Sequence, residues 1–173
     1  MSQTVICLGL YADAETADRE LEGLKELGLN KHIFLHDAAV VVRGADGTVE
    51  ISERTKQHGA IGGAMVGGAI GLFAALVPPI GIAAIAFGAG AGAVAGDIAG
   101  HVTGGLSKHE AEELGAFLAD GEVSLVVITD EESEATVLNG MGAARERVSR
   151  TSNVSAESLH EVVEAAHGKS GDS

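Results

Sequence analysis

One segment constrains this chain more than any other: residues 57–96 contain no Asp, Glu, Lys or Arg. Eleven of these 40 residues are glycine, and most of the others are alanine or larger apolar residues. Both flanks are acidic, with ten acidic and six basic side chains in residues 1–56 and fifteen and five in residues 97–173. The net charge of -14 therefore lies outside the uncharged segment. This partition predicts a water-facing domain interrupted by an apolar insert.

The glycines of the insert recur every four residues in two rows. The rows are Gly59, Gly63, Gly67 and Gly71, then Gly88, Gly92, Gly96, Gly100 and Gly104. Residues four apart share one face of an α-helix, and each interior glycine costs about 1 kcal/mol relative to alanine. The rows therefore favour two helices whose backbones pack closely, as in small-xxx-small contacts. Pro78-Pro79 separates the two arms and predicts the turn of a helical hairpin.

Three interpretations of the insert remain open. An arm of 18 residues would be roughly 27 Å long, about the hydrocarbon thickness of a bilayer, which favours a membrane hairpin ending near Gly96. The flanks would then form a cytoplasmic domain. Alternatively, the hairpins form the apolar core of a soluble, cytoplasmic homo-oligomeric ring, tube or particle. The third interpretation is a small-molecule or nucleotide-binding protein, because residues 90–95 resemble a glycine-rich fingerprint, although the four-residue glycine period indicates helix packing instead.

The flanks are predicted to alternate strands and helices. The predicted strands cover residues 4–10, 38–43, 48–52, 123–129 and 150–154, and an Asp46-Gly47 turn joins the second to the third. The predicted helices begin at an Asp13 N-cap, at a Ser107/Glu110 capping box, at Glu131 (ending at Val148) and at Ser155.

These elements predict an α+β fold, a ferredoxin-like split βαβ sheet domain interrupted by a two-helix glycine-zipper hairpin. The domain would be discontinuous, from residues 1–56 and 106–168, with the hairpin at 57–105 and a disordered tail at 169–173. Because insertions are tolerated best where their termini meet, the two ends of the insert are expected to lie close together.

Nothing in the flanks predicts catalysis, so we expect a non-enzymatic protein without cofactor or metal. His32 and His36 are spaced to share a helical face beside Asp37, but a third ligand is missing and surface histidines are favoured. Cys7 is predicted to be a small core residue of a strand. The acidic residues that begin the capping-box helix are expected to be solvated and favoured by the helix dipole; they are Glu110, Glu112 and Glu113. His58 and His101 bracket the insert, as a pH-sensitive contact or as ordinary interfacial residues.

The composition also limits the partners. Phosphate binding needs basic residues and base stacking needs aromatic ones, but this acidic chain has four Phe, one Tyr and no Trp, so nucleic acid is not expected. A single cysteine excludes an intrachain disulfide, and residues 1–11 lack the features of a signal peptide. The acidity fits a high-salt host or a merely acidic protein equally. The expected partners are a second copy, through the hairpin, and a lipid bilayer.

The order of several segments resembles a family of predicted bacterial and archaeal membrane proteins of unknown function. The resemblance depends on residues 35–42 and the Asp46-Gly47 turn, residues 58–63, 67–73, 78–81 and 88–96, the pair Glu113-Leu114, and residues 121–129. It implies a ferredoxin-like domain with a glycine-rich hairpin insert and a membrane location. It implies no catalytic residues.

Overall fold

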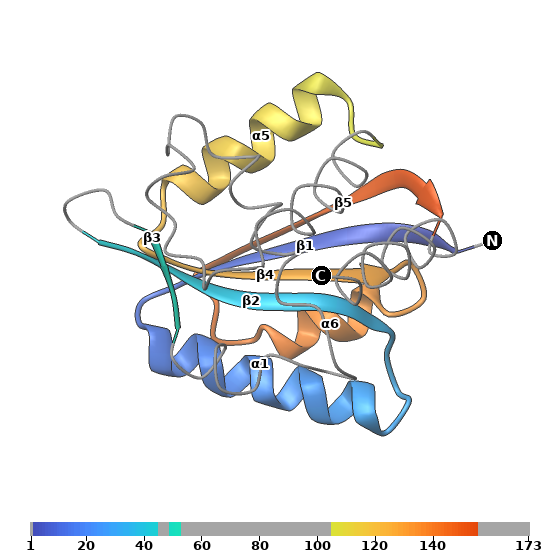
Figure 1. Ribbon diagram of the computed structural model, residues 1–173, viewed down its shortest axis with the longest axis horizontal. Helices are drawn as coiled ribbons and strands as arrows, with labels where there is room; N and C mark the ends of the chain where they lie inside the picture. Colours follow the sequence, from blue (N-terminus) through green and yellow to red (C-terminus); the bar gives the residue numbers. More distant parts are fainter. Residues whose placement is uncertain (1, 45–48, 53–104, 156–173) are drawn as a thin grey trace, which may run out of the picture.

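The computed structural model describes residues 2–44, 49–52 and 105–155, which form a sheet with helices on both faces (Figure 1). The strands are β1 (Gln3–Tyr11), β2 (Leu35–Arg43), β3 (Val49–Ile51), β4 (Val123–Asp130) and β5 (Glu146–Ser155). The helices are α1 (Ala14–Leu29), α5 (Lys108–Ala119) and α6 (Glu134–Gly140). The predicted α+β class is therefore confirmed for the described part of the chain.

The strands lie in the order β3-β2-β4-β1-β5, and every neighbouring pair is antiparallel. β4 lies between β1 and β2, the two strands that α1 connects. In the same way, β1 lies between β4 and β5, which α6 connects. Val5 of β1, for example, pairs with Thr129 on one side and with Thr151 on the other. Strands from both flanks of the glycine-rich segment therefore alternate within one sheet.

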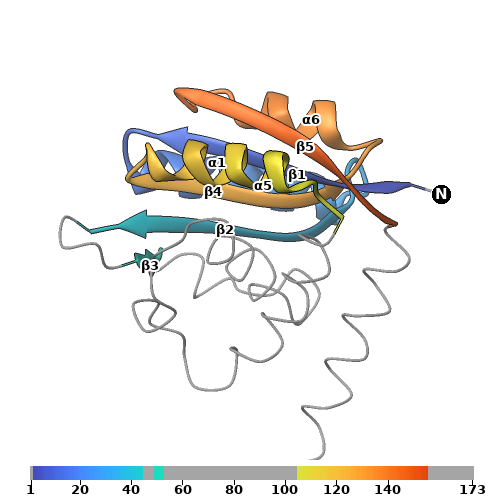
Figure 2. The ribbon, with the colours of Figure 1, turned by 90° about the horizontal axis from the view of Figure 1, so that it is seen from above.

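The two faces of the sheet are covered by different helices. Helices α1 and α6 cover one face, and α5 lies on the opposite face (Figures 1 and 2). Side chains alternate along each strand, so Val5 and Cys7 belong to the core under α1, and Ile6 and Leu8 point to the other face. Leu114 and Leu118 of α5 are fully buried. The described part thus has apolar packing on both sides of β1.

Two of the four helix starts predicted from the sequence, those at Asp13 and at Ser107, are confirmed. The Asp13 carboxylate accepts a hydrogen bond from the Thr16 N–H at 2.8 Å, and Ser107 and Glu110 form a reciprocal capping box. Side-chain acceptors at these positions satisfy N–H groups that have no partner within the helix. The predicted pairing of residues 48–52 with the preceding strand is confirmed for Val49–Ile51, and the Asp46-Gly47 turn lies outside the described residues.

The prediction of one helix from Glu131 to Val148 was wrong. Helix α6 ends at Gly140, and β5 begins at Glu146, well before the predicted strand at 150–154. The apolar spacing of this region fits a helical stripe, but Val148 instead pairs with Leu8 of β1. Strand pairing along the whole of β1 outweighs the local helical pattern.

The described residues that flank the glycine-rich segment, Ser52 and Gly105, lie at different edges of the sheet, while the start of the insert at residue 57 lies outside the described residues, so the expected closeness of its two ends stays a prediction. The Ser52 N–H donates to the Val40 carbonyl at the β2/β3 side of the sheet, whereas the Gly105 carbonyl accepts from the Asn153 N–H at β5. These strands are at opposite edges of the sheet, because β3 pairs with β2 and β5 pairs with β1. The predicted hairpin arms, the helix at 155–168 and the tail lie outside the described residues.

Candidate functional site

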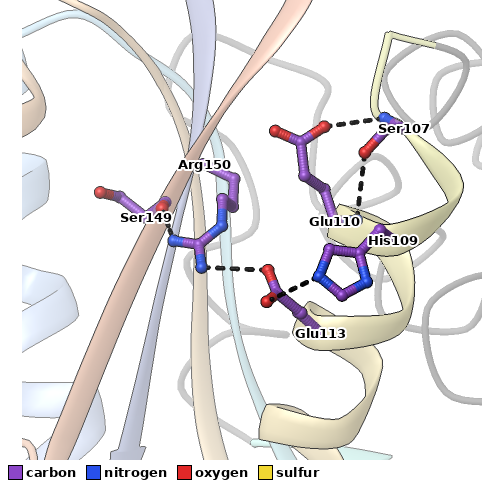
Figure 3. Close-up of polar contacts among 6 residues, drawn as sticks. All are labelled: Ser107, His109, Glu110, Glu113, Ser149 and Arg150. Atoms are coloured by element: carbon purple, nitrogen blue, oxygen red, sulfur yellow. Dashed lines mark hydrogen bonds and ion pairs between the residues drawn. The ribbon is translucent and has the colours of Figure 1, made fainter.

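Helix α5 is the first described element after the glycine-rich segment, and polar contacts connect it to the sheet. Glu113 lies between Arg150 and His109: its Oε2 is 3.2 Å from Nη2 of Arg150, and its Oε1 is 3.3 Å from Nε2 of His109 (Figure 3). Arg150 also donates through Nη1 to the Ser149 carbonyl of its own strand at 2.7 Å. Partly exposed ion pairs contribute about 0–1 kcal/mol each, so this group positions α5 over β5 more than it stabilises the fold.

The N-terminus of α5 is closed by its capping box. The Ser107 Oγ accepts from the Glu110 N–H at 3.2 Å, and the Glu110 carboxylate accepts from the Ser107 N–H at 2.8 Å (Figure 3). The bond from the Ser107 backbone is the main cause that lowers the pKa of Glu110, because it stabilises the charged carboxylate. The first turn of α5 is therefore occupied by the chain's own carboxylate.

At the other end of α5, Arg43 of β2 binds the helix terminus. Its Nη1 donates to the Ala119 carbonyl at 2.9 Å, and its backbone N–H donates to the Glu122 carbonyl at 2.7 Å. A cation is favourable at the carbonyl end of a helix. The remaining Nε and Nη2 atoms of this guanidinium are buried, and no described group accepts from them. Those two N–H groups form the edge that binds carboxylate or phosphate oxygens in a bidentate manner.

A small cavity lies beside the same end of α5. Its volume is about 260 Å³, and its described lining residues are Leu10, Asp120, Arg145 and Glu146. This is below the roughly 300–1,000 Å³ that is usual for small-molecule sites. Its lining combines one basic with two acidic side chains but no nucleophile, so it does not suggest a covalent mechanism.

The polar groups under α1 and α6 stabilise the fold. Tyr11 donates its hydroxyl hydrogen to Glu20 at 2.6 Å, and the same carboxylate accepts the Ala143 N–H at 2.8 Å. Cys7 is fully buried, and burial, followed by the charge of Glu134, raises the pKa of its thiol to about 12. A thiol with this pKa is protonated at neutral pH and is a poor nucleophile. The prediction that Cys7 is a core residue is therefore confirmed.

The residues predicted to pack helices lie outside the described part of the chain: both glycine rows, Pro78 and Pro79, together with His58 and His101. His32 and His36 do not share a helical face, because His32 follows α1 in a turn and His36 lies in β2. Within residues 2–44, 49–52 and 105–155, no group of three or more His, Cys, Asp or Glu residues is placed to hold a metal ion.

Sequence reasoning missed the two arginines that contact α5. Glu113 was expected to be merely solvated, but it pairs with Arg150, and Glu112 is 3.8 Å from Lys108. A local signal exists only for Arg43, a single basic residue that ends a run of apolar strand residues. Nothing near Arg150 in the sequence points to Glu113, because 36 residues lie between them.

The described fold belongs to the class of α+β domains built on an antiparallel sheet. The chain belongs to the family described as protein of unknown function DUF1269, which matches residues 60–166. No curated protein and no solved structure matches the chain. The match confirms a family of unknown function, but it begins inside the glycine-rich segment and so leaves out β1, α1, β2 and β3.

Within the described ranges, none of α1, α5 and α6 combines the length and the apolar character that a membrane crossing requires.

Proposed function

We propose that the chain is a non-enzymatic, self-associating structural protein. In this proposal a ferredoxin-like domain carries a two-helix glycine-zipper hairpin, and the hairpin inserts in a membrane with the acidic domain on the cytoplasmic side. The glycine rows of neighbouring hairpins would pack together and form a homo-oligomer. The strand order supports the ferredoxin-like assignment, because each βαβ unit encloses one strand of the other unit.

The direction of the chain at both ends of the glycine-rich segment carries this proposal. Strand β3 pairs antiparallel with β2, so at Ser52 the chain runs toward the end where β2 begins. Gly105 binds Asn153 near the end of β5, and there β5 pairs with the first residues of β1. We call this the entry end: the first residues of β1 and β2 and the last residues of β4 and β5. The described chain thus runs toward the entry end at Ser52 and resumes near that end at Gly105, which supports a hairpin beyond it.

Substitution of the glycine rows tests self-association. Gly67→Leu and Gly92→Leu are expected to reduce the size of the oligomer, because a leucine side chain separates helices that glycines let approach. Gly23→Leu is the matched control, since a Cβ at Gly23 in α1 meets nothing within 4 Å. Light scattering coupled to size-exclusion chromatography in detergent measures the mass of the oligomer. An unchanged mass in both variants, with the control also unchanged, would reject the glycine interface.

Fractionation tests membrane insertion separately. After expression, the wild-type chain is expected to stay with the membrane pellet through carbonate and high-salt washes and to be released only by detergent. Release as a monodisperse soluble particle would reject insertion and support the homo-oligomer whose apolar core is made of packed hairpins.

A further inference from the structure

Two large apolar side chains of the described part are exposed, and they lie at the same turn. Leu29 ends α1 and is 71% exposed, and Phe34 precedes β2 and is 69% exposed. The other large apolar residues around them, such as Ile33, are buried or partly buried. Scattered apolar residues on a surface need no explanation, but two at one turn in so acidic a chain are unusual enough to suggest a contact.

The backbone holds Phe34 firmly in this exposed position. Its N–H donates to the Ser133 Oγ at 2.8 Å, and its carbonyl accepts from the Thr129 Oγ1 at 2.5 Å. Its ring lies 6.3 Å from that of His36. Because hydrogen bonds to the β4–α6 region fix the main chain on both sides, the exposure of the ring is a feature of the folded state.

The turn itself carries basic but no acidic side chains. Residues 27–36 contain no Asp or Glu, and Glu26 and Asp37 flank them. Lys31 is exposed and has a positive φ of 59°, and the exposed His32 follows it. Two acidic residues, Glu131 and Glu132, lie on the neighbouring turn after β4. Lys31 at the tip of the turn would therefore attract an anionic surface, whereas Glu131 and Glu132 on the neighbouring turn would repel it.

The turn lies at the entry end of the sheet. Leu35 pairs with Thr129 near the end of β4, and Figure 1 places this turn, the end of β5 and the start of α5 at one end of the molecule. The exposed apolar residues thus lie at the end of the sheet toward which the chain runs at Ser52 and near which it resumes at Gly105.

We propose that Leu29, Lys31 and Phe34 form a lipid-contact patch that rests in the interface of a bilayer. The proposal rests on the membrane insertion proposed above, because insertion places the entry end against the lipid. In this orientation Leu29 and Phe34 enter the region of the head groups, and Lys31 meets lipid phosphates. Leucine and phenylalanine flanked by a basic residue match the composition of interfacial anchors.

Because the chain contains no tryptophan, a single substitution provides a site-specific probe of this contact. Phe34→Trp places the probe in the patch, and Asp120→Trp places it at the opposite end of the sheet, after α5. The full chain is reconstituted in phosphatidylcholine vesicles with and without phosphatidylserine. Quenching by lipids brominated on the acyl chains is expected for Phe34→Trp, with a blue-shifted emission, and not for Asp120→Trp.

The outcomes separate the patch from the hairpin. Carbonate-resistant membrane binding without quenching at position 34 would overturn the patch and leave insertion intact. Quenching at position 34 with release by carbonate would keep the patch and reject insertion. Equal quenching at both positions would overturn the orientation. A blue shift that appears without lipid and grows with protein concentration would identify a second copy as the occupant and overturn the lipid contact.

A further variant measures the contribution of the basic residue. In the chain that carries Phe34→Trp, Lys31→Gln is expected to reduce the bromolipid quenching on vesicles with phosphatidylserine, and to leave the quenching on phosphatidylcholine alone unchanged. Equal losses on both lipids for Lys31→Gln would contradict a role of its charge. Circular dichroism of each variant confirms that the sheet is folded.

Discussion

Gly140 and Gly23 lie on facing helices, and their surroundings differ. A Cβ at Gly140, the last residue of α6, would lie 2.5 Å from Cδ2 of Leu24, which is itself buried in α1. A Cβ at Gly23 would meet no atom within 4 Å. The close approach of α6 to α1 therefore depends on the missing side chain at Gly140, whereas Gly23 only lowers the helix propensity of α1.

Alanine at these two positions is expected to change stability in opposite directions. Gly140→Ala should lower the free energy of unfolding by about 1–3 kcal/mol, because Leu24 or the α6 backbone must shift. Gly23→Ala should raise it by about 0.5–1 kcal/mol by removing backbone freedom from the unfolded chain. Urea unfolding followed by circular dichroism measures both. Equal effects of the two variants would show that the contact with Leu24 has no energetic weight.

At the scale of the elements, the capping box of α5 links its stability to pH. The folded state lowers the pKa of Glu110 from 4.5, and the hydrogen bond from the Ser107 backbone is the first cause. A lowered pKa means that this carboxylate stabilises the fold above pH 4.5, and that the contribution is lost as the pH falls through the lower folded value. At pH 7 the contribution is fully present.

Glu110→Gln isolates this effect. The variant is expected to be less stable than the wild type at pH 7, and the difference should shrink as the pH falls below 4.5, where Glu110 becomes protonated. Glu112→Gln is the control, since Glu112 makes only a long contact of 3.8 Å with exposed Lys108. Denaturant unfolding at several pH values measures the difference. A difference that stays constant from pH 7 to pH 3 would contradict the link to Glu110.

The elements differ in how well the sequence predicts them. The starts of α1 and α5 are encoded locally, because Asp13 and Ser107 bind N–H groups only three residues ahead. The end of α6 is not encoded locally. Gly140 at this end approaches Leu24, which is more than 100 residues away in the sequence, and the following residues pair as β5 with β1. For the same reason no pattern near Arg150 predicts its contact with Glu113, and the apolar run that Arg43 ends marks this arginine but does not identify α5 as its partner. Of the candidate site, the capping box could be predicted, whereas the cation partners of α5 could not.

At the scale of the whole molecule, the family match covers only part of the described sheet. Residues 60–166 include β4 and β5, but these strands do not pair with each other, because β1 lies between them. A chain of residues 60–166 is therefore expected to lack the protected amides of a folded sheet in hydrogen exchange. Adding residues 1–59 should restore protection in β4 and β5. A folded sheet from residues 60–166 alone would contradict the strand order.

The width of the sheet also affects the proposed hairpin. Four strand spacings of about 4.8 Å, roughly 19 Å in all, separate β3 from β5. Packed helices lie about 8–10 Å apart. For the proposed hairpin to pack its two arms together, the chain between Ser52 and Gly105 would have to bridge this difference.

The central place of β1 has a consequence for synthesis on the ribosome. β1 is made first, but both of its neighbours are made last, after the whole glycine-rich segment. At about 5–20 residues per second, β1 waits roughly 7–30 s for the end of β5. During that time a nascent strand with the sequence QTVICLGLY has neither edge paired. Such apolar, β-prone segments aggregate readily, so the newborn chain is expected to depend on chaperones or on early membrane targeting until Ser155 has emerged.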